Sequence, residues 1–102
     1  MADIYVTDYG VPHEITITRN GAAANISDAT LMALTYKKPN GDTLEKTPVF
    51  KSDGSDGVIT YTFVVGDIEA GDYGTWKYQA YVETASSGRH TQHGTLEVGS
   101  NL

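Results

Sequence analysis

Apolar and polar residues alternate along most of this chain, and no stretch of it has the spacing of an amphipathic helix. The segment 58–65 is the clearest case, because β-branched or aromatic residues fill every position. In a strand, Ile59, Tyr61, Phe63 and Val65 share one face. A repeat of two residues is the pattern of a β-strand with one buried face. The sequence therefore predicts an all-β protein.

Turn-forming residues divide the chain into short strands. Asn20 and Gly21 suit a type I′ turn, because both tolerate a positive φ. The segment 39–42 predicts the turn of a hairpin, and 52–57 predicts a loop. Regular short strands of this kind are typical of an antiparallel β-sandwich of about seven strands. The expected strands are 13–19, 30–37, 43–46, 58–65, 74–83 and 91–98, with a shorter apolar piece at 49–51 and a short strand or coil at 22–24.

The period also predicts which side chains point inward. Each strand contributes alternate apolar residues to one face, and aromatic residues among them bring large buried areas. The residues expected to point inward are Tyr61, Phe63, Trp76, Tyr78, Leu96 and Val98. The residues expected to share one face of their strand are Ile15 with Ile17, Met32 with Leu34 and Tyr36, and Trp76 with Tyr78, Ala80 and Val82.

The 102 residues suffice for one domain and are too few for two ordinary ones. We expect a single domain over residues 1–102, with the termini 1–3 and 99–102 loose because they have little to bury. The chain has no cysteine, so it can form no disulfide and no thiolate metal site. That composition fits a protein made in a reducing cytoplasm.

The net charge is −6 at pH 7, with 13 acidic residues against 7 lysines and arginines. Nucleic acids and anionic membranes attract proteins largely through lysine and arginine, so neither is an expected partner. No apolar run approaches the length of about 20 residues that a membrane span needs. The first residues also lack the basic and apolar regions of a signal peptide.

Two features resemble metal sites, and both favour a simpler interpretation. His90 and His93 are three residues apart, which places their rings on opposite faces of a strand, and we expect solvent-exposed loop histidines, His13 included. The segment 53–57 resembles part of a calcium loop, but Val64 stands where a bidentate glutamate is needed. We therefore expect a flexible turn at 53–57, and neither a metal nor a cofactor.

Catalytic motifs are also missing from the sequence. It contains no Gly-x-Ser-x-Gly elbow for a nucleophile, and the glycines at 71–74 lack the pattern of a phosphate-binding loop. A carboxylate pair for glycoside hydrolysis remains open, although a sandwich of this size leaves little room for a cleft. The sequence favours a protein that is not an enzyme.

An interface is the remaining kind of site. The outward face of the strand 74–83 and the N-terminal arm 4–9 are the two candidate surfaces. Tyr5, Tyr9 and Tyr81 are the aromatic residues expected to be exposed, where they would contact a protein or, as the alternative, stack on a sugar. The candidate interface residues are Ile4, Tyr5, Tyr9, Lys77, Gln79, Tyr81 and Glu83.

The segment 67–80 resembles the corner between strands E and F of immunoglobulin-like domains. In that corner an acidic residue and a glycine precede a tyrosine, here Tyr73, whose hydroxyl can bond back to the main chain. Thr75 stands where antibody domains have a cysteine. The resemblance implies an immunoglobulin-like sandwich without a disulfide, anchored by the corner from Tyr73 to Trp76.

Nearly the whole chain resembles small immunoglobulin-like virion proteins of tailed bacteriophages, which are similar to the N-terminal domain of the phage baseplate upper protein. The matching motifs are 8–10, 25–30, 36–43, 53–61 and the corner at 71–76. The resemblance implies a structural role in the head, neck, tail or baseplate, in several copies that contact other virion proteins. Such a protein is made in the bacterial cytoplasm and ends in the virion. The alternative is a carbohydrate-binding module for attachment to surface glycans.

Overall fold

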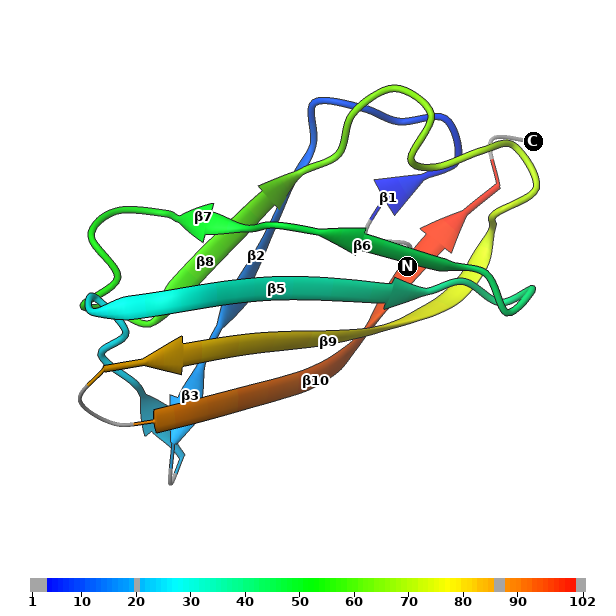
Figure 1. Cartoon of the computed structure of the whole chain (residues 1–102). Helices are drawn as coiled ribbons and strands as arrows, with labels where there is room; N and C mark the ends of the chain where they lie inside the picture. Colours follow the sequence, from blue (N-terminus) through cyan, green and yellow to red (C-terminus); the bar gives the residue numbers. More distant parts are fainter. Residues whose placement is uncertain (1–3, 20, 86–87, 101–102) are drawn as a thin grey trace.

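The computed structural model describes residues 4–19, 21–85 and 88–100, and it confirms the all-β prediction (Figure 1). These residues form no helix and ten strands, rather than about seven. Four of the strands are only two residues long. The strands are β1 (Ile4–Tyr5), β2 (Pro12–Thr16), β3 (Thr18–Arg19), β4 (Ala22–Ala23), β5 (Ala29–Lys37), β6 (Thr43–Lys46), β7 (Val49–Phe50), β8 (Val58–Thr62), β9 (Gly74–Thr84) and β10 (Gly88–Gly99).

The strands form two main layers. One layer is a five-stranded sheet in the order β1-β10-β9-β5-β6, and the other is a three-stranded sheet in the order β2-β8-β7. Figure 1 shows β5, β9 and β10 running across one side of the molecule, with β2 and β8 on the other. All strand pairs are antiparallel except that of β1 with β10. The short pair β3–β4 forms a third, separate sheet.

Aromatic rings from both layers meet in the core. Tyr36 of β5 lies 5.9 Å from the ring of Trp76 of β9 and 5.3 Å from that of Phe63, which follows β8. Phe63 also meets Trp76 edge to face, as aromatic pairs prefer. Phe63, Trp76, Leu96 and Val98 are buried as predicted, whereas Tyr61 and Tyr78 are only half-buried. The buried hydrophobic residues are Ile4, Val6, Ile15, Ile17, Ala24, Ile26, Leu34, Tyr36, Ile59, Phe63, Ile68, Trp76, Ala80, Val82, Leu96 and Val98.

The hairpin of β5 and β6 has the predicted turn. The Lys38 N–H donates to the Asp42 carbonyl at 2.8 Å, and the Gly41 N–H donates to the Lys38 carbonyl at 2.9 Å. Gly41 has a φ of 94°, which glycine adopts without strain. In the other predicted turn Gly21 has a φ of 82°, while Asn20 lies outside the described residues.

The loop 51–57 is held against the rest of the chain, which corrects the expectation of a flexible turn. The Gly57 carbonyl accepts from the Ile17 N–H at 2.8 Å, and the Gly54 carbonyl accepts from the Ile26 N–H at 2.9 Å. Gly57 has a φ of 74°, and a Cβ on it would lie 2.6 Å from the Ala24 carbonyl oxygen. Only glycine fits there, because both the conformation and the space exclude a side chain.

Strand 58–65 ends earlier than the alternation predicts. β8 stops at Thr62, Phe63 still points inward, and Val64 and Val65 are 52% and 76% exposed. The Asp67 N–H donates to the Val64 carbonyl at 3.1 Å, so a turn replaces the last part of the strand. The predicted extension of this strand to Val65 is therefore wrong.

The ends of the chain are tied by the pairing of β1 with β10. Ile4 lies opposite Val98 and is only 3% exposed, so its prediction as an interface residue is wrong. The arm does not stand free, because its first strand completes the edge of the sheet. Gly99, which begins the segment 99–102, pairs with Tyr5. Residues 1–3, 101 and 102 lie outside the described residues.

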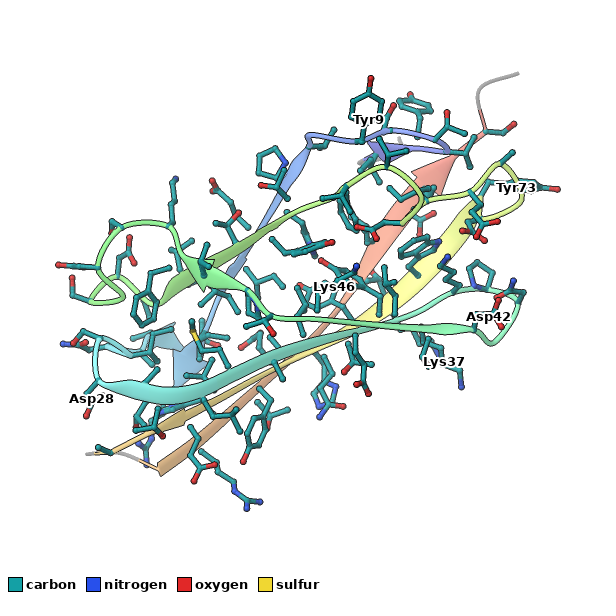
Figure 2. All side chains as sticks on the ribbon, turned by 45° about the horizontal axis from the view of Figure 1, so that its top comes forward. Tyr9, Asp28, Lys37, Asp42, Lys46 and Tyr73 are labelled. Carbon is teal, nitrogen blue, oxygen red and sulfur yellow. The ribbon has the colours of Figure 1, made fainter. Side chains whose placement is uncertain are left out.

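The corner before β9 differs from the one that the resemblance implies. Tyr73 is 57% exposed and points away from the molecule (Figure 2), so it does not have the expected anchoring role. Instead, the Trp76 Nε1–H donates to the Asp72 carbonyl at 2.7 Å. The buried indole thus holds the corner, and Gly74, the first residue of β9, has a φ of 127°.

Candidate functional site

Two buried aspartates fix the long connection from β8 to β9. Asp67 is 5% exposed, and one of its oxygens lies 3.0 Å from Nζ of Lys46 on β6. Its other oxygen accepts hydrogen bonds from the Tyr61 hydroxyl and, at 3.0 Å, from the Val64 N–H. Lys46 occupies the middle of the molecule in Figure 2, where its Nζ also lies 5.7 Å from the centre of the Tyr61 ring. Asp67, Tyr61 and Lys46 together join the connection from β8 to β9 to strand β6.

Asp72 fixes the end of the same connection, close to β9. Its carboxylate lies 2.7 Å from Nζ of Lys38 and accepts a hydrogen bond from the Glu69 N–H at 2.8 Å. The Lys38 ammonium also lies 5.3 Å from the centre of the Trp76 ring, within range of a cation–π interaction. Both aspartates therefore have cationic partners and main-chain donors, as buried charges require.

The pKa shifts of Asp67 and Lys46 agree with this structural role. Burial alone would raise the pKa of Asp67, but the hydrogen bonds from Tyr61 and Val64 and the charge of Lys46 hold that pKa below its usual value. The hydrogen bond to Asp67 in turn raises the pKa of Lys46. Burial also raises the pKa of Tyr36 far above that of free tyrosine. Asp67 and Lys46 therefore remain a charged pair over a wider pH range than free side chains would, and Tyr36 stays neutral to a higher pH than free tyrosine.

Four exposed hydrophobic residues lie on, or at the start of, two loops that meet. The Gly10 N–H donates to the Phe63 carbonyl at 2.7 Å, so the connection from β1 to β2 lies beside the start of the connection from β8 to β9. Both loops lie at the same end of the molecule in Figure 1. We call this surface the apolar end, and it consists of Tyr5, Tyr9, Val64 and Val65, which are 43%, 65%, 52% and 76% exposed.

The apolar end is built on ordered main chain. The Thr7 N–H donates to the Ile68 carbonyl at 3.0 Å, which joins the two loops a second time. Asp8 closes the turn before it, because its carboxylate accepts from the Tyr5 N–H at 3.0 Å. Thr7 has a φ of 65°, an unusual conformation for a β-branched residue. Strained positions of this kind cluster at functional sites, where the surrounding structure holds them in place.

The outward face of β9 forms a separate, polar surface. Lys77 and Gln79 are exposed there, whereas Tyr81 and Glu83 are half-buried. The Tyr81 hydroxyl donates to the Glu83 carboxylate at 3.1 Å, and the Arg89 guanidinium lies 5.7 Å from the centre of the Tyr81 ring. Tyr81 is therefore held by its neighbours on the sheet and offers less free aromatic surface than Tyr9.

A pocket of about 230 Å³ lies between β2 and β10. At its wall, Nδ1 of His13 lies 2.7 Å from the Tyr36 hydroxyl, and the ring of Tyr78 meets the His13 ring edge to face at 4.9 Å. The pocket is small for a ligand site, because drug-sized ligands occupy about 300–1,000 Å³. Its lining residues are Ile4, Val11, Pro12, His13, Glu14, Phe63, Thr95 and Leu96.

All three histidines lie on strands, so the expected loop positions are wrong. Full exposure to solvent is found for His93 but not for His13 or His90. His90 is 6% exposed and His93 is exposed, which confirms that the two point to opposite faces of β10. Within the described ranges, no three histidine, cysteine, aspartate or glutamate residues come together as metal ligands. The described ranges also contain no helix long and apolar enough to cross a membrane.

The predicted interface residues thus divide into two groups. Tyr5 and Tyr9 lie together at the apolar end, while Lys77, Gln79, Tyr81 and Glu83 lie on the outward face of β9. Sequence analysis missed Val64 and Val65, and the signal that marks them is the pair Gly66–Asp67, which favours a turn. No protein-family model matches the chain, and a search of curated proteins found no match to it.

Proposed function

We propose that this chain is a non-enzymatic structural component of a tailed-phage virion that acts through contacts with other virion proteins. The observation that carries the proposal is the apolar end, where Tyr9, Val64 and Val65 are exposed on two joined loops and Tyr5 is exposed at the end of β1. Exposed hydrophobic groups that are fixed in place favour a protein interface, because little conformational entropy is lost when they are covered. The phage assignment itself rests on the resemblance of the turn motifs.

We also propose that the fold is an immunoglobulin-like sandwich. In this assignment β2, β8 and β7 are strands B, E and D, and β5, β9 and β10 are strands C, F and G. The sheet orders β10-β9-β5 and β2-β8-β7 agree with the two sheets of that fold. The parallel strand β1 then lies beside strand G, and β6 lies beside strand C.

The positions of the buried carboxylates support a binding function rather than catalysis. Asp67 and Asp72, the buried carboxylates among the described residues, each bind a lysine and a main-chain donor. A general acid or base needs a carboxylate that can reach a substrate, and these two face the interior of the fold. Their arrangement positions the loops of the apolar end.

Incorporation into particles tests the proposal. Purified virions from a host that expresses the chain should contain it at a fixed copy number, measured by quantitative mass spectrometry. Val65→Ser and Tyr9→Ser should lower that copy number. Val49→Ser is the matched control, because Val49 is 60% exposed but lies on β7, away from the apolar end. Absence of the wild-type chain from the virions would contradict the proposal.

A glycan-binding attachment module is the second candidate function. The exposed rings of Tyr5 and Tyr9 favour it, because aromatic faces stack on sugars. A glycan array distinguishes the two functions. Binding to a glycan that Tyr9→Ser abolishes would support attachment, and an array without any bound glycan would argue against it.

A further inference from the structure

The five lysines of the chain differ in how their charges are balanced. Lys38, Lys46 and Lys51 each lie within 3.2 Å of a carboxylate oxygen, those of Asp72, Asp67 and Glu14. Within the described residues, Lys37 and Lys77 have no such partner. Both are exposed, and Lys37 projects from β5 away from the body of the molecule (Figure 2). Two positive charges are thus left unpaired in a chain of net charge −6.

These two lysines are direct neighbours. Lys37 of β5 lies opposite Lys77 of β9 in the antiparallel register, so both side chains leave the same face of the sheet side by side. Like charges opposite each other destabilise a strand pair. The chain has 13 acidic residues, yet none of those described forms an ion pair with either lysine. The sheet therefore carries an electrostatic cost that an anion between the lysines would remove.

A pocket of about 160 Å³ lies at this position. Lys38 is fixed on one side of it by the ion pair with Asp72. The β5–β6 turn forms another side, where Pro39 packs so closely on Gly74 that a Cβ at position 74 would lie 2.9 Å from the proline ring. Rigid walls next to two free ammonium groups suit a small anionic group. The pocket is lined by Lys37, Lys38, Pro39, Gly41, Thr75 and Lys77.

We propose that Lys37 and Lys77 bind a carboxylate group from an acidic segment of a protein partner. This inference rests on the proposed function, and it names the chemistry of one contact that such a partner would make. Two carboxylates near the pocket are engaged with other groups, since Asp72 pairs with Lys38 and Glu97 accepts from the Thr75 hydroxyl at 2.6 Å. Glu45 of β6 lies diagonally from Lys37 on the same face but forms no ion pair with it, so both ammonium groups are open to an anion from outside the domain.

The lining favours an acidic peptide over an acidic sugar. No aromatic ring lines the pocket, so it offers no face on which a sugar ring would stack. The volume suits a side-chain carboxylate rather than a chain of sugar rings. A glutamate or aspartate in an extended segment would reach both ammonium groups, and each contact would be a charge-assisted hydrogen bond.

The test is a titration of the whole ¹⁵N-labelled chain with hexaglutamate, followed by NMR. We expect saturable shifts of the backbone amides of 37, 38, 41, 75 and 77. The double variant Lys37→Gln/Lys77→Gln should bind the peptide about tenfold more weakly, because two cationic contacts are lost. Lys51→Gln is the matched control, because Lys51 is an exposed lysine on the far side of the fold, paired with Glu14. It should bind as the wild type does.

The repulsion between the two lysines also predicts the stability of the free protein. At low ionic strength, Lys77→Gln removes the repulsion from Lys37 and should raise the melting temperature, and salt should shrink the difference. A fall in melting temperature at low salt would mean that Lys77 already has a favourable role in the free domain, and it would overturn the inference.

Three binding results would also overturn it. Equal affinity of the wild type and the double variant for hexaglutamate would show that the lysines do not form the site. Shifts with polygalacturonate alone would identify a sugar site, and shifts with inorganic phosphate alone would identify a small-anion site. If hexaglutamate does not bind at the lysines, the prediction that virions contain the chain still stands. If the chain binds the peptide but is absent from virions, only the proposed function is contradicted.

Discussion

The side chain of Tyr78 on β9 lies directly across Gly94, its partner on β10, so that a Cβ at position 94 would overlap the phenol ring. Because Gly94 leaves this space free, the ring also reaches His13 of the opposite layer and meets it edge to face at 4.9 Å. A glycine within a regular strand usually weakens it, but here the aromatic ring covers the position. The pair thus joins neighbouring strands and both layers.

Gly94→Ala should therefore destabilise the domain by about 2 kcal/mol, because the methyl group forces the Tyr78 ring off its place. Urea denaturation followed by the fluorescence of Trp76, the only tryptophan, measures the change. Gly71→Ala is the control, since a Cβ at Gly71 meets nothing within 4 Å. Tyr78→Phe added to Gly94→Ala should recover part of the loss, because it removes the overlapping hydroxyl. An equal effect of both alanines would contradict this account of Gly94.

The ion pair of Lys46 and Asp67 should contribute far more than the one of Lys51 and Glu14. Lys46→Met leaves the carboxylate of Asp67 buried without its cation and should cost about 2 kcal/mol. Lys51→Met should change the free energy of unfolding by no more than about 0.5 kcal/mol, because both groups of that pair are exposed. The two variants differ by the same chemical change, so comparable losses in urea denaturation would refute the structural role of Lys46.

Stability should fall at acid pH in part because of Asp67. Its pKa is lower in the folded chain than the usual value of about 3.9, so the folded state binds this proton more weakly. The contribution is then complete above the unfolded pKa and is lost as the pH falls through the folded value. Denaturation curves between about pH 6 and pH 2 measure it. Asp67→Asn should be less stable at pH 7 and should show a shallower decline, and an unchanged slope would rule out this assignment.

Alkaline pH should destabilise the fold through Tyr36. Burial raises the pKa of Tyr36 well above the ordinary value of 10.0, so the folded chain resists losing this proton while the unfolded chain does not. Stability should therefore fall as the pH rises beyond about 10. Absorbance of tyrosinate should show some tyrosines titrating normally and a remainder that titrates only on unfolding.

Gly57→Ala should be much more damaging than Gly21→Ala. Both glycines have a positive φ, but only the Cβ at position 57 would meet main-chain oxygens, those of Ala24 and Ile17. We expect a loss of about 3 kcal/mol at Gly57 and about 1 kcal/mol at Gly21, where nothing lies within 4 Å. Melting temperatures of the two variants compare them directly, and similar values would show that the loop 51–57 yields to the methyl group.

Local features of the fold could be predicted from the sequence, and long-range ones could not. The hairpin of β5 and β6 follows from residues that are close in the chain, and its return strand lies at the predicted positions 43–46. The alternation predicts that strand 58–65 extends through Val65. The pattern gives no information on the hydrogen bond from the Val64 N–H to Asp67, which turns the chain. The sequence pattern does not reveal that Ile4 is buried, because its partner, Val98, lies at the other end of the sequence.

The candidate sites show the same limit. Tyr5 and Tyr9 could be predicted as exposed aromatic residues, but their neighbours Val64 and Val65 come from a distant loop. The opposition of Lys37 and Lys77 depends on the register between two strands far apart in the sequence. A pattern of residue types within one strand does not determine that register, which depends on packing across the whole sheet.

The parallel pairing of β1 with β10 has a mechanical consequence. A force applied to the chain just before Ile4 and just after Gly99 pulls the two strands past each other along their length. The hydrogen bonds between them, including that from the Val6 N–H to the Gly99 carbonyl, then carry the tension together instead of breaking in turn. When the domain is pulled at these two points, it resists extension because β1 and β10 must slide past each other. A pull that peels β10 from β9 would instead open that pair one hydrogen bond at a time.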